Sequence, residues 1–224
     1  MTTRTRSSRR QEDVLGRGPI ARAWSKVFAA GYDSLNSGAE EGGVAELRAA
    51  LLKRASGHVL EIGAGTGTNL PHYPAGLRSL TLTEPDLAMR RRLESRLDTA
   101  GAQHRVLPER AESLPLATDS VDTVVCTYVL CGVDLPAAFD EIRRVLRPGG
   151  QLLFLEHVRS PEPGLAKWQD RLNPLWSAVA CGCNCNRMTE EAITAAGFTI
   201  TDIERGGVQD EVALVRPIIW GRAV

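Results

Sequence analysis

Glycines at every second position, preceded by an acidic residue, mark the part of this chain best suited to hold a nucleotide-like ligand. The apolar stretch 59–62 runs into Gly63, Gly65 and Gly67, and Glu61 lies two positions before the first glycine. Glycines at the end of a strand let a ligand approach the backbone closely. A dinucleotide-binding turn has the spacing G-x-G-x-x-G and receives a pyrophosphate, which Glu61 would repel. Glu61 would instead accept hydrogen bonds from an ammonium group, so the pattern favours a cofactor that joins adenosine to an amino acid.

A second acidic residue follows at the distance expected for one strand, helix and strand. Residues 78–83 predict a strand, and Glu84 comes directly after it, about 20 residues beyond the glycine turn. A carboxylate at this point can accept hydrogen bonds from both hydroxyls of a ribose. We therefore expect Glu84, with the adjacent Pro85, to bind the ribose, and Asp86 to cap a helix over 87–99.

Alternating strands and helices predict the sheet that would position these residues. Parallel strands are expected at 58–62, 78–83, 103–107, 121–128 and 151–158, with helices at 87–99 and 136–146. A further helix at 190–196 precedes two final strands, 198–203 and 214–223, that would pair as an antiparallel edge. The sequence therefore predicts an α/β fold with a doubly wound, mostly parallel seven-stranded sheet and an antiparallel edge strand.

Length and composition fit one domain. The chain has 224 residues, 43% of them apolar, and a formal net charge of zero, which favours a single core and gives nucleic acid no electrostatic footprint. Residues 1–18 are expected to form a flexible basic arm, and 19–224 the domain. No segment has the pattern of a membrane span or a signal peptide, so we expect a cytoplasmic protein with reduced cysteines.

Together these motifs resemble the class I S-adenosylmethionine-dependent methyltransferases over residues 45–158. Segment 110–115 resembles the loop that holds the adenine in this family, which implies that Ala111 donates its backbone N–H to the ring and that Glu112 lies near the exocyclic amine. Many members carry Asp where this chain has Arg110. The resemblance implies a Rossmann-like methyltransferase fold, S-adenosyl-L-methionine as cofactor and S-adenosyl-L-homocysteine as product.

The resemblance also implies further contacts to the cofactor. An amino-terminal helix, expected from about Ile20 to Ala30 within a lid over 19–55, would bring Tyr32 to the methionine end. Asn69 would contact the amino-acid end or cap the next helix. The other positions assigned to cofactor binding are Ala64, Thr66, Gly67, Cys126 and Thr127.

A closer resemblance covers most of the chain beyond residue 30. Segments 126–131, 154–158, 172–176, 182–184 and 214–217 resemble the methyltransferase-like thiol S-methyltransferases and their bacterial relatives. This likeness implies transfer of the methyl group to the sulfur of a small acceptor with apolar character. Animal members of the family are held at membranes by an apolar amino-terminal segment, which we do not expect here.

Methyl transfer from a sulfonium needs few catalytic residues, because the leaving group is already good. A thiol acceptor needs only a nearby base or positive group that raises its thiolate fraction. His157, beside Glu156 at the end of the fifth strand, is the candidate for that role, although it can also be structural. Tyr128 can present its ring or its hydroxyl to the methyl group, or belong to the core.

The segment 161–186 is expected to interrupt the helix between the fifth and sixth strands and to shape the acceptor pocket. Its two tryptophans, Trp168 and Trp176, would supply an apolar wall or pack against the sheet.

Three cysteines lie near the end of this segment, and their thiolates could bind a metal ion. Cys181, Cys183 and Cys185 alternate with other residues, unlike the Cys-x2-4-Cys pairs of structural zinc sites, so no metal site is expected. Cys183 alone matches a Gly-Cys element of the thiol methyltransferases and is expected to line the pocket.

Three functional hypotheses remain open at this point. The first is methyl transfer to a small molecule, with a thiol favoured and N-, O- or C-methylation of a lipid, a quinone precursor or a natural product as alternatives. The second is a nicotinamide-dependent oxidoreductase, which the glycine spacing and Glu61 disfavour. The third is a non-catalytic module that binds the cofactor. The sequence gives no sign of the oligomeric state.

Overall fold

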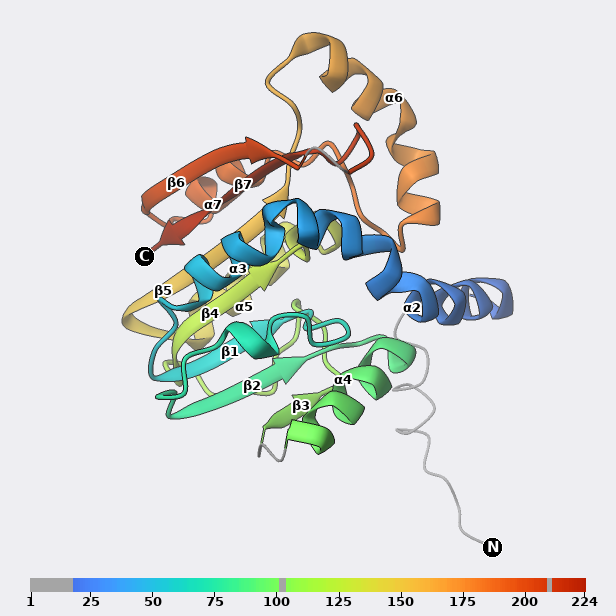
Figure 1. Ribbon diagram of the computed structural model, residues 1–224. Helices are drawn as coiled ribbons and strands as arrows, with labels where there is room; N and C mark the ends of the chain where they lie inside the picture. Colours follow the sequence, from blue (N-terminus) through green and yellow to red (C-terminus); the bar gives the residue numbers. More distant parts are fainter. Residues whose placement is uncertain (1–17, 101–103, 209–210) are drawn as a thin grey trace, which may run out of the picture.

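Seven strands form one sheet in the order β3-β2-β1-β4-β5-β7-β6 (Figure 1). The strands are β1 (His58–Ile62), β2 (Ser79–Thr83), β3 (Arg105–Leu107), β4 (Val121–Thr127), β5 (Leu146–His157), β6 (Ile200–Gly207) and β7 (Pro217–Ala223). Strands β1 to β5 run parallel, and β7 lies antiparallel to both β5 and β6. The predicted fold class, including the antiparallel pairing at one edge, is confirmed.

This computed structural model describes residues 18–100, 104–208 and 211–224. The basic arm expected over 1–18 therefore lies almost entirely outside the described residues, as does the beginning of the strand expected at 103–107. Among the described helices, none is both long enough and apolar enough to cross a membrane.

Helices cover both faces of the sheet, as a doubly wound fold requires. On one face α3 (Ala45–Leu52) and α4 (Leu87–Ala100) bury leucines against β1 and β2. On the other face α5 (Leu135–Val145) and α7 (Thr189–Ala195) pack on β4 and β5. The parallel strands are therefore apolar on both sides, which is typical of such sheets.

Helix α5 follows from its cap and its apolar face. The Asp134 side chain accepts from the Ala137 backbone N–H, and Phe139, Ile142 and Val145 are buried on one side. The helix stops at Val145, and β5 begins at Leu146, earlier than the expected 151, because Leu146 already pairs with Val121 of β4 before the register shifts and Gln151 pairs with Thr123.

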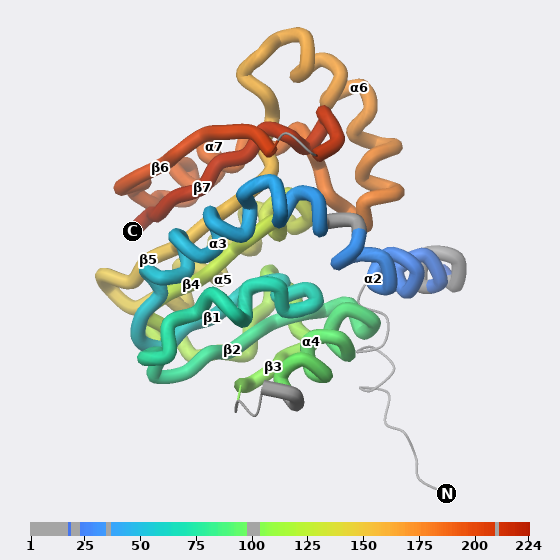
Figure 2. The backbone as a smooth tube through the Cα atoms, viewed as in Figure 1, coloured from blue at the N-terminus to red at the C-terminus, as the bar shows by residue number. Residues whose placement is uncertain are grey.

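The amino-terminal helix is longer than expected. Helix α2 spans Pro19–Ala39 rather than ending near Ala30, and a π-helical turn, Glu40–Val44, joins it to α3. The junction contains Gly43 at a φ of 109°, which gives the chain its change of direction. As a result α2 lies across the carboxyl ends of the parallel strands (Figure 2).

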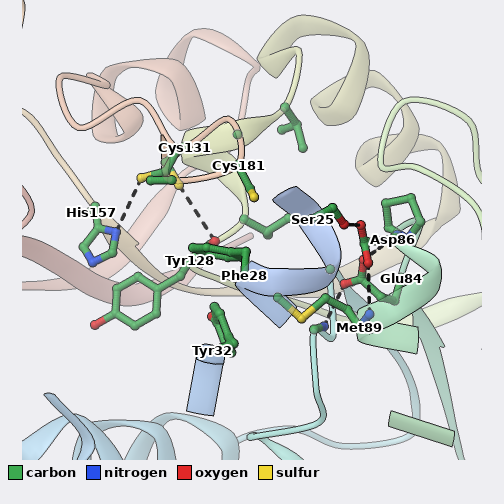
Figure 3. Close-up of a pocket in the computed structure, with 18 of the residues that line it drawn as sticks. Ser25, Phe28, Tyr32, Glu84, Asp86, Met89, Tyr128, Cys131, His157 and Cys181 are labelled. Atoms are coloured by element: carbon green, nitrogen blue, oxygen red, sulfur yellow. Dashed lines mark hydrogen bonds between the residues drawn. The ribbon is translucent and has the colours of Figure 1, made fainter. Parts of the chain in front are cut away.

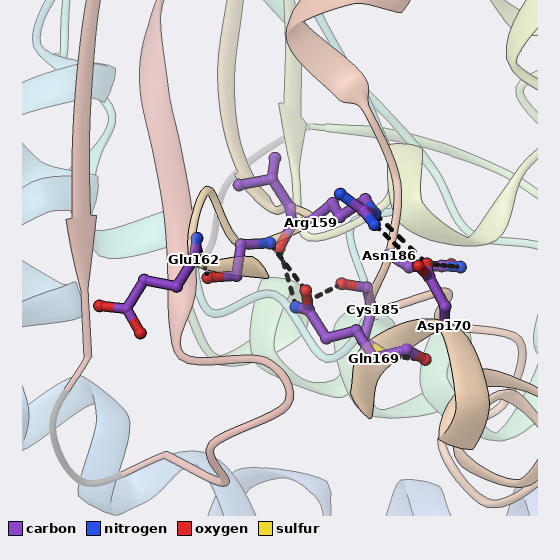
Figure 4. Close-up of polar contacts among 8 residues, drawn as sticks. Arg159, Glu162, Gln169, Asp170, Cys185 and Asn186 are labelled. Carbon is purple, nitrogen blue, oxygen red and sulfur yellow. Dashed lines mark hydrogen bonds and ion pairs between the residues drawn. The ribbon is translucent and has the colours of Figure 1, made fainter. Parts of the chain in front are cut away.

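The segment 161–186 contains a helix, which corrects the expectation that it interrupts one. Helix α6 (Pro163–Val179) contains Pro174 within it and projects beyond the sheet (Figure 1). The fully buried Gln169 attaches it, because its amide donates to the carbonyls of Val158, Cys185 and Leu214 and accepts from the Ser160 N–H. Figure 4 shows the contact between Gln169 and Cys185. One polar side chain thus joins α6 to the body of the domain.

Candidate active site

A cavity of about 540 Å³ lies at the carboxyl ends of the parallel strands. The glycine turn after β1, the end of β2 and the loop after β3 line one end, and Tyr128, His157 and the loop after α6 line the other. Helix α2 contributes Phe28 and Tyr32 between the two ends (Figure 3). One continuous space therefore connects the expected cofactor and acceptor residues.

The glycine turn needs glycine for its conformation. Gly63, Gly65 and Gly67 have φ values of 66°, 58° and 89°, which disfavour residues with a side chain. A Cβ on Gly63 would lie 2.5 Å from Cγ2 of Val129. Gly63 and Gly65 line the cavity, whereas Gly67 packs against Leu70. The turn therefore exposes backbone to the cavity at its first two glycines.

Glu84 lies at the cavity wall beside this turn. Its carboxylate accepts from the backbone N–H groups of Gly65 at 2.8 Å and Asp86 at 2.7 Å. Burial nevertheless raises the pKa of Glu84 to about 7. Pro85 also lines the cavity. The predicted cap is confirmed, because Asp86 Oδ1 accepts from the N–H groups of Ala88 and Met89.

The loop after β3 completes this end. Ala111 and Glu112 both line the cavity. Arg110, which replaces the family's usual Asp, pairs with Glu112 at 3.2 Å. Partial burial alone would raise the pKa of Glu112. The hydrogen bonds from Arg110 and from the Asp134 N–H outweigh this effect and hold that pKa below its usual value. Glu112 is thereby kept ionised.

Glu61 belongs to a buried polar network behind the turn rather than to the cavity lining. Its carboxylate accepts from Asn69 Nδ2 at 2.9 Å and from the Tyr73 hydroxyl at 2.8 Å. Asn69 also accepts from Arg48 and donates to Thr127 Oγ1. Asn69 makes no side-chain cap to the following turn, so that alternative is wrong. Arg48, which the motifs did not reveal, supplies the positive charge for this network.

The remaining predicted cofactor residues divide between the cavity and the core. Tyr32 lines the cavity, and burial raises its pKa to about 12. Ala64 and Cys126 are buried outside the lining. The Thr66 hydroxyl donates to Asp33 at 2.6 Å, and Asp33 pairs with Arg96 of α4. Thr66 therefore ties α2 to α4 rather than facing the cavity.

The acceptor end is organised around a stacked pair of rings. Tyr128 directly follows β4. Its φ of 56° does not fit an extended strand, so β4 stops at Thr127, one residue earlier than expected. Its ring stacks on His157 with a centroid distance of 4.2 Å, and the Arg48 guanidinium lies 5.2 Å from the Tyr128 ring centre. The Tyr128 hydroxyl is buried without a hydrogen-bond partner. Among the described residues, the side-chain contacts of Tyr128 therefore involve its ring and not its hydroxyl.

His157 lies between a thiol and a carboxylate. Its Nδ1 is 3.9 Å from Cys183 Sγ, and its Nε2 is 3.4 Å from Glu211 Oε2. Burial alone would lower the pKa of His157. Hydrogen bonds to Cys183 and Glu211 outweigh this effect and raise that pKa to about 9. Hydrogen bonds from Cys131 and then His157 lower the pKa of Cys183 to about 5. Of the two roles expected for His157, this arrangement supports a positive group rather than a free base.

The structure also changes the list of acceptor residues. Trp176 lines the cavity, whereas Trp168 is 57% exposed and lies outside it, against both expectations for that residue. Cys183 lines the cavity as expected. Sequence reasoning assigned no role to Cys131, although it ends the matched segment 126–131, or to Glu211, which belongs to no matched segment. The other lining residues that it missed include Ser25, Phe28, Met89 and Val215.

Comparisons with known proteins agree with this architecture. Residues 60–154 match the methyltransferase domain family. Human thiol S-methyltransferase TMT1B is 40% identical over 184 residues, which cover 77% of this chain and 73% of TMT1B. A Thermotoga maritima S-adenosylmethionine-dependent methyltransferase, described as a possible histamine N-methyltransferase, superposes with a TM-score of 0.66 at 21% identity, covering 90% of this chain and 98% of that one.

A second solved structure carries the product of the cofactor. Geranyl diphosphate C-methyltransferase from Streptomyces coelicolor, in complex with Mg²⁺, geranyl diphosphate and S-adenosyl-L-homocysteine, superposes with a TM-score of 0.64 at 16% identity, over 82% of this chain and 78% of its own. At such identities the likeness concerns the fold. The fold and the sequence matches together define an S-adenosylmethionine-dependent methyltransferase.

Within that class, the chain belongs to the methyltransferase family that includes TMT1B. Family membership removes the nicotinamide-dependent alternative, and it places the chain in a family of methyltransferase enzymes whose cofactor is S-adenosylmethionine.

Proposed function

We propose that this protein transfers the methyl group of S-adenosylmethionine to the sulfur of a small, apolar thiol. The observation that carries the proposal is that both sets of residues line the same cavity. Glu84 and the glycine turn lie at one end of it, and His157 and Cys183 lie at the other. The name of the relative TMT1B, a thiol S-methyltransferase, supports a sulfur acceptor.

The cofactor end is assigned from the cavity lining. Glu84 would accept from the ribose hydroxyls, and the exposed backbone at Gly63 and Gly65 would lie against the cofactor. Ala111 and Glu112 would hold the adenine. When bound, the cofactor supplies an activated methyl group as a sulfonium, so the protein's task is to align the acceptor and exclude water.

Helix α2 has the position needed for that exclusion. Phe28 and Tyr32 line the cavity between its two ends, with ring centres 5.6 Å apart. The Ser25 hydroxyl donates to Asp86, and Asp33 is linked to α4 through Arg96. Two polar contacts therefore hold α2 over the cofactor end, and we assign it the role of a lid.

The acceptor end would receive the thiol beside the stacked rings. Trp176, Val179 and Val215 give this end its apolar wall. We assign His157 the task of favouring the thiolate form of the acceptor, since its Nδ1 already lies beside a sulfur atom. Tyr128 would present its ring to the sulfonium.

Release of S-adenosylhomocysteine from a panel of acceptors tests the proposal. We expect turnover with small apolar thiols, and none with amines, phenols or activated carbons of similar size. Turnover confined to amines, phenols or carbon acceptors would overturn the sulfur assignment. Calorimetry should show binding of S-adenosylmethionine and S-adenosylhomocysteine but not of NAD, and no turnover with any acceptor would leave only a binding module.

A further inference from the structure

Two cysteines and a histidine from three separate segments meet at the acceptor end of the cavity. The ligand atoms of Cys131, His157 and Cys183 all lie within 4.8 Å of one another. Cys131 follows β4, His157 ends β5, and Cys183 lies in the loop after α6. Sulfur and imidazole nitrogen are the ligands that zinc prefers in proteins.

The spacing of these atoms is close to that of a tetrahedral zinc site. Zinc–sulfur and zinc–nitrogen bonds of about 2.3 and 2.0 Å place neighbouring sulfur and nitrogen ligands about 3.6 Å apart. Cys183 Sγ and His157 Nδ1 are 3.9 Å apart. A shift of a few tenths of an ångström would therefore bring these two atoms to coordination distance.

The backbone around the two cysteines holds them together independently of their side chains. Asn184 donates both its backbone N–H and its Nδ2 to the carbonyl of Cys131, at 3.0 and 2.9 Å. Asn173 of α6 in turn donates to Asn184 Oδ1. On the strand side, the Glu156 carboxylate accepts from the N–H groups of Val129 and Leu130, just before Cys131.

The histidine is oriented as zinc-binding histidines usually are. Its far nitrogen, Nε2, faces Glu211 Oε2 at 3.4 Å, and both atoms are buried without another partner. A carboxylate behind a metal-bound imidazole fixes the ring and strengthens its binding. The stacking on Tyr128 fixes the plane of the same ring. The nitrogen next to Cys183 is left as the metal-facing atom. With zinc bound His157 would be neutral, so the ion would supply the positive charge that the metal-free site assigns to His157.

We propose that Cys131, His157 and Cys183 bind a zinc ion whose fourth position opens into the cavity. All three residues line that cavity, and three protein ligands with one open position are typical of catalytic rather than structural zinc. Zinc prefers sulfur ligands, so a thiolate from the acceptor would complete the tetrahedral set as the fourth ligand. Sequence spacing suggested no metal because only Cys183 of the three alternating cysteines takes part.

The role of this ion in methyl transfer rests on the proposed function. A thiol that coordinates zinc loses its proton to solvent at neutral pH. The zinc-bound thiolate then donates an electron pair to the methyl carbon, the bond from that carbon to the sulfonium sulfur breaks, and its electron pair stays on S-adenosylhomocysteine. The product is a neutral thioether, a weaker ligand that can leave.

Metal analysis of the full chain tests the site itself. We expect about one zinc per chain after exchange against metal-free buffer. Cobalt substitution should give the absorption of a tetrahedral ion with sulfur-to-metal charge transfer, a readout that needs no variant. A chain that takes up no zinc, an octahedral cobalt spectrum, or a disulfide between Cys131 and Cys183 in the protein as purified would overturn the proposal.

Variants identify the ligands. Cys131→Ser, Cys183→Ser and His157→Ala should each lose zinc, and Glu211→Gln should weaken zinc binding about 10- to 100-fold. Cys181→Ser, in the same loop, is the matched control and should keep the metal. Binding of S-adenosylhomocysteine at the other end of the cavity verifies that each variant is folded. Equal zinc loss in Cys181→Ser and Cys183→Ser would refute the assignment.

The two proposals can fail separately. If zinc binds but no thiol is methylated, the site stands and the sulfur acceptor is wrong. If zinc-free protein methylates thiols at the full rate, the acceptor is right and the role of the metal is wrong. Addition of a thiol should also change the cobalt spectrum, which reports coordination without turnover.

Discussion

The two ends of the cavity are built in different ways. At the cofactor end, three short segments supply what is needed, and each has its own sequence motif: the turn with Gly63 and Gly65, the strand end with Glu84, and the loop with Ala111 and Glu112. At the acceptor end, Cys131, His157 and Cys183 come from three segments that only the folded chain brings together. A fold class can therefore keep its cofactor site within contiguous motifs, while its acceptor site depends on tertiary contacts.

This difference predicts that changes at one end leave the other end intact. Changes at the cofactor end should alter the affinity for S-adenosylhomocysteine, and changes at the acceptor end should alter turnover at constant cofactor affinity. The variants below test that separation.

The largest effect is expected from Gly63→Val. The residue has a φ of 66°, and a Cβ there would lie 2.5 Å from Val129 Cγ2, so both the backbone and the neighbouring side chain oppose the change. We expect the affinity for S-adenosylhomocysteine to fall by at least about 100-fold in calorimetry. Gly76→Ala is the control, because nothing lies within 4 Å of its Cβ position. Equal binding by the two variants would contradict the role of the turn.

His157→Gln should act at the other end only. We expect thiol methylation to fall about 100-fold or more, while the affinity for S-adenosylhomocysteine changes by less than about twofold. His58→Gln serves as the matched control, since His58 begins β1 and bonds to Ser79. A fall in cofactor affinity as large as the fall in turnover would show that the two ends do not behave separately.

Glu84 should make cofactor binding depend on pH. Burial raises its pKa to about 7, and the two ribose hydroxyls need the carboxylate, so binding favours the ionised form. Affinity is then complete above this pKa and is lost as the pH falls through it, by about tenfold between about pH 8 and about pH 6. Calorimetry at several pH values measures this change.

Glu84→Gln is the companion measurement. Gln keeps the shape of the side chain but cannot accept at both oxygens, so the affinity should be about 10- to 100-fold lower and independent of pH in this range. A pH dependence that survives in Glu84→Gln would assign it to another group.

The sequence predicted the cofactor end of the cavity better than the acceptor end. Periodicity and turn residues predicted the strands and α5, and the spacing from Gly63 to Glu84 predicted the cofactor end, because all of these depend on neighbours along the chain. The length of α2 and the helical state of 163–179 were not predicted. Both elements are stabilised by distant contacts, such as those of Asp33 with Arg96 and of Gln169 with three carbonyls.

The acceptor end shows most clearly what local sequence patterns cannot predict. Cys131 and Cys183 are 52 positions apart in the sequence, and the bonds from Asn184 to the Cys131 carbonyl bring their two loops together. Likewise, Glu61 is predicted to accept from the cofactor's ammonium group, and in the folded chain Asn69 and Tyr73 also donate to its carboxylate. Whether a polar side chain faces a cavity or a network depends on partners that no local pattern reveals.

The smallest effect is expected from Tyr128→Phe. The Tyr128 hydroxyl is buried without a partner while its ring stacks on His157, so removal of the hydroxyl should leave turnover within about threefold and should not lower the thermal stability. Tyr73→Phe is the matched comparison. Its hydroxyl donates to the buried Glu61 carboxylate at 2.8 Å, and removing it should cost about 1–3 kcal/mol of stability.

Turnover and thermal unfolding of the two variants decide between ring and hydroxyl. A large loss of turnover in Tyr128→Phe, at unchanged affinity for S-adenosylhomocysteine, would mean that the hydroxyl acts on the acceptor. Retained turnover would assign the role to the ring, and Tyr128→Leu should then lose it, because the stacking that orients His157 disappears with the ring. The acceptor end would in that case depend on the shape of Tyr128, and the network at Glu61 on the hydroxyl of Tyr73.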